Sequence, residues 1–98
     1  WRLDTHWKHL KSEVPHLTRA PSEQIRDHIW VSTQPMEEPE RGAHVLDICE
    51  WIGWDHILFA TDYPHWDFDD PREALPGIIP PERRRDIFGG NARKLYGF

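Results

Sequence analysis

The sequence predicts an α/β fold, because segments with the pattern of strands alternate with segments with the pattern of helices. Two short apolar runs, residues 29–31 and 57–60, are separated by a helical pattern. The second run is unbroken rather than alternating, which is typical of a strand in a parallel sheet that is covered on both faces. We therefore expect two parallel strands joined by a right-handed crossover. Two such strands do not make a stable sheet alone, so the sequence describes part of an α/β domain.

Two helices are expected before the first strand. The first covers residues 1–13 and ends before Pro15, because its apolar residues recur at helical spacing. These residues are Leu3, Trp7, Leu10 and Val14. A second, short helix is expected to begin at Ser22, whose hydroxyl would act as the N-cap. The strand at 29–31 then ends in a loop at 32–35.

The clearest helical pattern lies between the two strands. The acidic segment 37–40 suits a helix start, where the helix dipole favours negative charge. Apolar residues follow at i, i+3, i+4 and i+7, and Gly53 ends the helix. They are Val45, Ile48, Cys49 and Ile52.

The C-terminal third is expected to hold a long loop and two helices. Residues 65–81 are rich in proline and lack periodicity, which indicates a loop. A helix is predicted over 81–88, and the pair Gly89 and Gly90 is expected to stop it. Asn91 would then cap a last helix at 92–96, and Gly97 is expected to end it.

Composition narrows the class of protein. Ninety-eight residues with 38% hydrophobic content suit one small domain or a piece of a larger one, taken here as residues 1–98. The net charge of −5 and a single basic cluster at 83–85 argue against a nucleic-acid partner. The chain has no apolar run of membrane-spanning length and one cysteine, so we expect a cytoplasmic protein without a membrane partner. Because the first residue is Trp1 rather than Met, we also expect sequence upstream.

Asp62 is the leading candidate for chemistry. It follows the apolar strand 57–60 by two residues, and functional side chains of parallel α/β folds gather beyond the carboxyl ends of strands. A carboxylate in this place can bind a divalent metal, act as a general base or orient a substrate. Alternatively, Asp62 caps a turn with its side chain. Both interpretations are open on pattern alone.

The neighbours of Asp62 have a functional and a simpler interpretation. His65 and Trp66 can face the same pocket as Asp62, or His65 is an ordinary loop histidine exposed to water. Gln34, after the first strand, can donate to a substrate or simply end the strand, as can Ser32 and Thr33. Three further acids lack the glycine and the glutamate of a calcium loop, so we expect solvated carboxylates and a helix N-cap. These are Asp67, Asp69 and Asp70.

Other candidate ligands are weaker. His6 and His9 are three residues apart on a predicted helix, which can clamp a metal, but no third ligand is near in sequence. We therefore expect a surface pair. Cys49 lies on the apolar face of its helix and is expected to serve packing.

Two motifs carry a family resemblance. ILFATDYPH at 57–65 and DIFGGNARKLYG at 86–97 resemble the end of the amidohydrolase-related family. These are metal-dependent TIM-barrel hydrolases and decarboxylases, including aminocarboxymuconate-semialdehyde decarboxylase and the resorcylate decarboxylases. VSTQPM at 31–36 resembles the preceding strand of that family, so the likeness covers most of residues 29–98.

The resemblance implies a C-terminal fragment of a (β/α)8 barrel carrying the last two strand-helix units. Asp62 would be the last-strand ligand of a catalytic divalent metal, with zinc expected first and manganese second, and would handle the proton of the attacking water. The implied reaction is hydrolysis or non-oxidative decarboxylation of a small carboxylic or aromatic acid. Tyr63 and His65 would shape the substrate pocket, beside Trp66 and Gln34.

The upstream histidine ligands of that family have no counterpart in the chain, so we expect no turnover from these 98 residues alone. The activity would belong to a parent of roughly 250 residues or more. A second interpretation is a stand-alone interaction module that uses exposed indoles to bind a partner. A third is a unit that forms a homo-oligomer through open strand edges.

Overall fold

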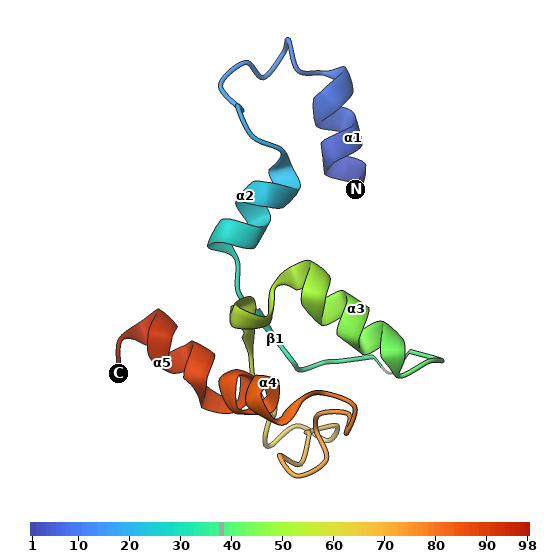
Figure 1. Cartoon of the computed structure of the whole chain (residues 1–98), viewed down its shortest axis with the longest axis vertical. Coiled ribbons are helices and arrows are strands. Elements are labelled where there is room, and N and C mark those ends of the chain that lie inside the picture. The colour runs from blue at the N-terminus through green and yellow to red at the C-terminus, as the bar shows by residue number, and fades with distance from the viewer. Residues whose placement is uncertain (38) are drawn as a thin grey trace.

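The computed structural model describes residues 1–37 and 39–98 as a set of short helices around one two-stranded sheet (Figure 1). Strands β1 (Val31–Ser32) and β2 (Ile57–Leu58) pair in parallel, with Val31 opposite Ile57 and Ser32 opposite Leu58. The mixture of helices with a small parallel sheet agrees with the predicted α/β class and is compatible with part of such a domain.

Both strands differ from their predicted bounds. The first was expected at 29–31 but begins at Val31, because the N–H of Ile29 still donates to the oxygen of Ile25, 2.9 Å away, at the end of the preceding helix. The second was expected to reach Ala60 but ends at Leu58, since the N–H of Ala60 donates to a side chain rather than to the sheet.

Helices α1 (Arg2–His9) and α2 (Pro21–His28) precede the sheet. The expected first helix ends at His9 instead of residue 13. Ser22 is not the N-cap of α2, because the helix begins at Pro21, a residue suited to the first turn since it lacks an N–H group. The N–H of Ser22 instead donates to Asp4 Oδ1 of α1, 2.9 Å away.

Helix α3 (Ala43–Ile52) connects the two strands. It begins after Gly42, later than the acidic segment 37–40 that was expected to open it, and Glu38 lies outside the described residues. Gly53 ends α3 with a φ of 104°, as predicted, and the short helix η1 (Trp54–His56) leads into β2. Val45 and Cys49 are buried, whereas Ile48, predicted on the same apolar face, is 51% exposed.

The C-terminal helices form one continuous rod. Helix α4 (Pro81–Arg85), the π-helical turn η2 (Asp86–Gly90) and α5 (Asn91–Tyr96) follow without a break. The prediction that Gly89 and Gly90 stop the helix is wrong, because Gly90 has helical backbone angles, with φ −58° and ψ −45°. Gly97, with a φ of 73°, ends the rod as predicted.

Asn91 is not a helix cap. Its backbone is helical and its side chain is 1% exposed, facing the core. Asn91 Nδ2 donates to the main-chain oxygens of Trp54 and Ile57, each 2.8 Å away. The last helical rod is therefore tied to η1 and to the start of β2.

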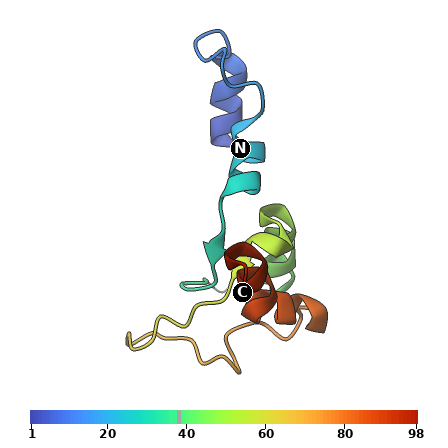
Figure 2. The ribbon, with the colours of Figure 1, turned by 90° about the vertical axis from the view of Figure 1, so that its left-hand side faces the viewer.

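The core is small and the molecule is elongated. The core consists of Val45, Cys49, Ile57, Leu75, Ile79 and Ile87. Helices α1 and α2 project away from this core (Figure 1, Figure 2). The radius of gyration is 16.2 Å, above the value of about 13 Å expected for a compact domain of 100 residues. The described part of the chain thus leaves much apolar surface exposed, including Trp1 and Trp51.

Within the residues that the structure describes, no helix has the length and apolar character required to cross a membrane.

Candidate functional site

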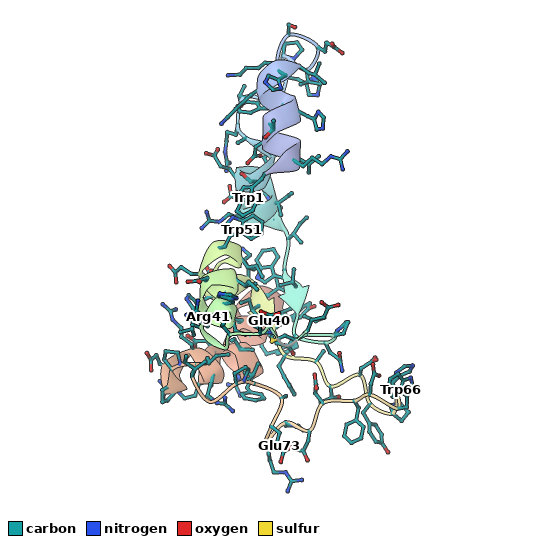
Figure 3. All side chains as sticks on the ribbon, turned by 90° about the vertical axis from the view of Figure 1, so that its right-hand side faces the viewer. Trp1, Glu40, Arg41, Trp51, Trp66 and Glu73 are labelled. Atoms are coloured by element: carbon teal, nitrogen blue, oxygen red, sulfur yellow. The ribbon has the colours of Figure 1, made fainter. Side chains whose placement is uncertain are left out.

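Asp62 lies in the loop that leaves the carboxyl end of β2. We call residues 61–69 the Asp62 loop, because the N–H of Asp69 donates to the oxygen of Thr61, 2.9 Å away, and closes the segment. In Figure 3 this loop, labelled at Trp66, extends away from the helices. Asp62 has a φ of 58°, in the left-handed region that aspartate tolerates better than most residues. The chain turns sharply at this residue.

The turn uses the backbone of Asp62 and not its carboxylate. The N–H of His65 donates to the main-chain oxygen of Asp62 at 2.8 Å. Over residues 1–37 and 39–98, the Asp62 carboxylate accepts no hydrogen bond, and its side chain is 58% exposed. The alternative in which Asp62 caps a turn with its side chain therefore does not describe this loop.

Asp62, His65 and Asp67 bring three potential metal ligands together. One donor atom of each lies within 4.8 Å of the others, and all three residues are exposed. His65 Nδ1 is 3.7 Å from Asp62 Oδ2 and is hydrogen-bonded to Asp67 Oδ1. Carboxylate oxygen and imidazole nitrogen are ligands that zinc and manganese accept. The donor set therefore fits a divalent metal, whereas the sequence motif points to Asp62 alone as a metal ligand.

Electrostatics link two of these residues. The hydrogen bond to Asp67 raises the pKa of His65, and the charges of Asp67 and Asp62 raise it further. The same hydrogen bond lowers the pKa of Asp67. The His65 ring thus keeps its proton to higher pH than an ordinary histidine. Because only the neutral ring binds a metal, loading this site would release that proton.

The predicted pocket residues do not enclose a cavity. Tyr63 is 75% exposed and Trp66 is 85% exposed. Tyr63 packs edge-on against Phe68, with ring centroids 5.7 Å apart. A cavity of about 340 Å³ adjoins the base of the loop, but Gln34, Tyr63, His65 and Trp66 do not line it. Its lining residues are Met36, Glu37, Pro39, Gly42, Val45, Asp69, Glu73, Ala74 and Pro76.

Gln34 contacts the Asp62 loop directly, and Thr33 contacts Ala60, the residue immediately before it. Gln34 Nε2 donates to the main-chain oxygen of Asp67 at 2.8 Å. Thr33 is 2% exposed, and its hydroxyl contacts the backbone of Ala60. The sequence pattern leaves the role of both residues open. Their place directly after a strand that pairs with β2 was the signal that connects them to this loop.

Two of the three acids that were expected to be solvated have side-chain partners, because Asp67 binds His65 and Asp70 binds Arg72. Asp70 is not a freely solvated acid, because it binds the side chain of Arg72 and accepts the Arg72 N–H at 2.9 Å. These bonds lower the pKa of Asp70 to about 2. The backbone contact caps a turn at residues 71–73, and no helix begins there in the described part of the chain, so the predicted helix N-cap is wrong.

The weaker candidates behave as expected. His6 and His9 are exposed on α1. Cys49 is buried in the core, and this burial raises the pKa of its thiol. A packing role for Cys49 agrees with both observations.

Comparison with known proteins gives one family. The family model described as amidohydrolase matches residues 1–98, the whole chain. The search of curated proteins finds no match. The match covers both resembling motifs and the two helices before them. The chain therefore belongs to the amidohydrolase family.

Proposed function

We propose that this chain supplies the last two strand-helix units of a metal-dependent enzyme with a (β/α)8 barrel. The family match, the parallel pairing of β1 with β2 and the intervening helix α3 support this proposal. The small core and the elongated shape also support it, because a barrel would supply the missing neighbours of both strands.

The observation that carries the proposal is the position of the Asp62 carboxylate and its lack of a hydrogen-bond donor among the described residues. The carboxylate lies beyond the carboxyl end of β2, where functional groups of such barrels gather, and none of the described residues donates a hydrogen bond to it. Asp62, together with ligands from upstream strands, would hold a divalent cation. Zinc is the leading candidate for this ion and manganese is the alternative. His65 and Asp67 lie close enough to add ligands or to orient Asp62. When bound, the ion supplies Lewis-acid activation of a water or of a substrate oxygen.

The Asp62 carboxylate would accept the proton of the attacking water. The proposed substrate is a small carboxylic or aromatic acid, and the reaction is hydrolysis or non-oxidative decarboxylation, as in aminocarboxymuconate-semialdehyde decarboxylase and the resorcylate decarboxylases. Tyr63 and Trp66 would offer aromatic faces to such a substrate, beside His65 and Gln34. Closure of this surface into a pocket would require the upstream part of the barrel.

The 98 residues alone are expected to be inactive. The described donors come from one exposed loop, and a catalytic zinc commonly has three protein ligands in an enclosed site. A second candidate function is an interaction or self-associating module. One observation favours it, an open apolar hollow lined by Trp1, directly before α1, and by Asp47, Ile48 and Trp51 of α3. Figure 3 shows Trp1 and Trp51 side by side.

The test is Asp62→Asn in the complete polypeptide that contains this chain. We expect the variant to lose metal affinity and turnover by about 100-fold or more, since even residues behind the metal ligands typically contribute about 10-fold to 100-fold. Asp69→Asn is the matched control, because it removes a carboxylate from the same loop without touching the three clustered side chains. Metal content is measured after dialysis, and carbon dioxide release separates decarboxylation from hydrolysis. An Asp62→Asn protein that keeps both its metal and its rate would refute the ligand assignment.

A further inference from the structure

We propose that Thr33 and Gln34 are positioning residues that hold the Asp62 loop against the end of β1 and so place the Asp62 carboxylate. The proposal deepens the proposed function and rests on it, because it takes Asp62 as the metal ligand. Both residues are hydrogen-bonded to backbone groups and not to the Asp62 side chain, so both would act through the backbone.

Thr33 holds the entry to the loop. Its hydroxyl accepts a hydrogen bond from the N–H of Ala60 at 3.2 Å and lies 3.4 Å from the Ala60 oxygen, to which it donates. The N–H of Thr33 also donates to the oxygen of Leu58 at 2.9 Å, which continues the strand pairing by one residue. Because Thr33 is 2% exposed, these contacts are shielded from competing water.

Gln34 holds the far side of the same loop. Its amide nitrogen donates to the main-chain oxygen of Asp67 at 2.8 Å, five residues beyond Asp62. The Asp67 carboxylate in turn binds the His65 ring, and His65 faces Asp62. A shift of the Asp67 backbone would therefore move the neighbours of the Asp62 carboxylate.

No other part of the described chain donates to, or accepts from, residues 60–69. Their remaining hydrogen bonds are internal, such as those from Asp69 to Thr61 and from His65 to Asp62. Packing adds little at the tip, where Tyr63 and Trp66 are largely exposed. Hydrogen bonds from two consecutive residues thus bracket Asp62 from before and after.

Amide hydrogen exchange on the metal-free complete polypeptide tests directly whether Thr33 and Gln34 hold the Asp62 loop. Thr33→Val keeps the side-chain shape and removes the hydroxyl, and Gln34→Met keeps the length and removes the donor. We expect amides of residues 61–69 to exchange about tenfold faster in each variant, since the loss of a hydrogen bond opens the loop locally. Thr33→Ser should restore slow exchange. Thr5→Val is the control, because it removes a hydroxyl of α1 that donates to the main-chain oxygen of Trp1.

Metal affinity, measured by chelator competition with zinc, tests the link to Asp62. Thr33→Val and Gln34→Met should weaken binding by about tenfold, the usual effect of residues that orient a ligand. If the loop amides of both variants exchanged within twofold of their rates in the parent, the proposal that Thr33 and Gln34 hold the loop would be overturned. It would also be overturned if Thr33→Val accelerated exchange in α3 and α5 as much as in the loop, because the hydroxyl would then serve global stability.

Unchanged zinc affinity with a loosened loop would overturn the positioning role. If the Asp62→Asn variant kept its zinc affinity, the proposed function would be refuted. The role of Thr33 and Gln34 in placing a metal ligand would be refuted with it. The exchange rates would still decide whether Thr33 and Gln34 hold the loop.

Discussion

Replacement of Asn91 tests how the C-terminal rod is attached to the sheet. Asn91 is 1% exposed and donates both of its side-chain hydrogens, one to the oxygen of Trp54 and one to the oxygen of Ile57. Asn91 Oδ1 is also buried, and no described residue donates to it. Asn91→Leu removes both donors and the unpaired oxygen at similar volume. Asn91→Asp keeps the shape and turns a donor toward two carbonyl oxygens into an acceptor.

The two variants should differ in size of effect. Loss of two hydrogen bonds costs about 2 kcal/mol of unfolding free energy, and removal of the unpaired oxygen returns about 1 kcal/mol, so Asn91→Leu should destabilise by about 1 kcal/mol. Asn91→Asp loses the same bonds and places a buried charge beside two oxygens, so it should cost about 3 kcal/mol or more at neutral pH.

Urea unfolding of the complete polypeptide, followed by tryptophan fluorescence, measures both effects. The Asn91→Asp defect should shrink in acid, because a protonated carboxyl can donate to one of the two oxygens. An Asn91→Asp variant as stable at neutral pH as Asn91→Leu would refute the reasoning. It would mean that the two carbonyl contacts do not hold the rod.

Two further predictions concern titratable groups. Asp4 Oδ1 accepts the Ser22 N–H, and hydrogen bonding with the side chain and backbone of Ser22 lowers the pKa of Asp4. This contact is therefore present above the ordinary pKa of 3.8 and is lost as pH falls through the lowered pKa. Asp4→Ala should speed exchange of the Ser22 amide about fivefold, the effect of a typical cap, and equal rates in the variant and the parent would exclude the contact. The raised pKa of His65 means that its attraction to Asp67 is complete below 6.5 and is lost as pH rises through the raised value. An NMR titration should place the His65 pKa above 6.5. The Asp67→Asn variant should return this pKa toward 6.5, and Asp62→Asn should lower it less because the charge of Asp62 contributes less. An unchanged His65 pKa in Asp67→Asn would contradict the pairing.

Local features of the fold could be predicted from the sequence because they depend on neighbouring residues. The unbroken apolar run at 57–60 indicated a parallel strand, and its first two residues pair in parallel with β1. Gly53 and Gly97 end their helices at positive φ, which glycine adopts without strain. The motif around Asp62 indicated the amidohydrolase family, which the family match confirms. Whether Asp62 binds the metal stays a prediction.

Contacts between distant residues required the tertiary structure. The sequence pattern predicts Asn91 as a helix cap, yet its side chain donates to the oxygens of Ile57 and Trp54, 34 and 37 residues away. Thr33 reads as the end of a strand, yet its hydroxyl meets Ala60, 27 residues away. Gly90 continues a helix because its neighbours pack against β2 and η1. The sequence by itself therefore determined the alternation of helices and strands and the candidate ligand, because periodicity and backbone preference act over a few residues. Only the tertiary structure decided which polar groups pair, because buried donors take whichever acceptors the packed chain brings near.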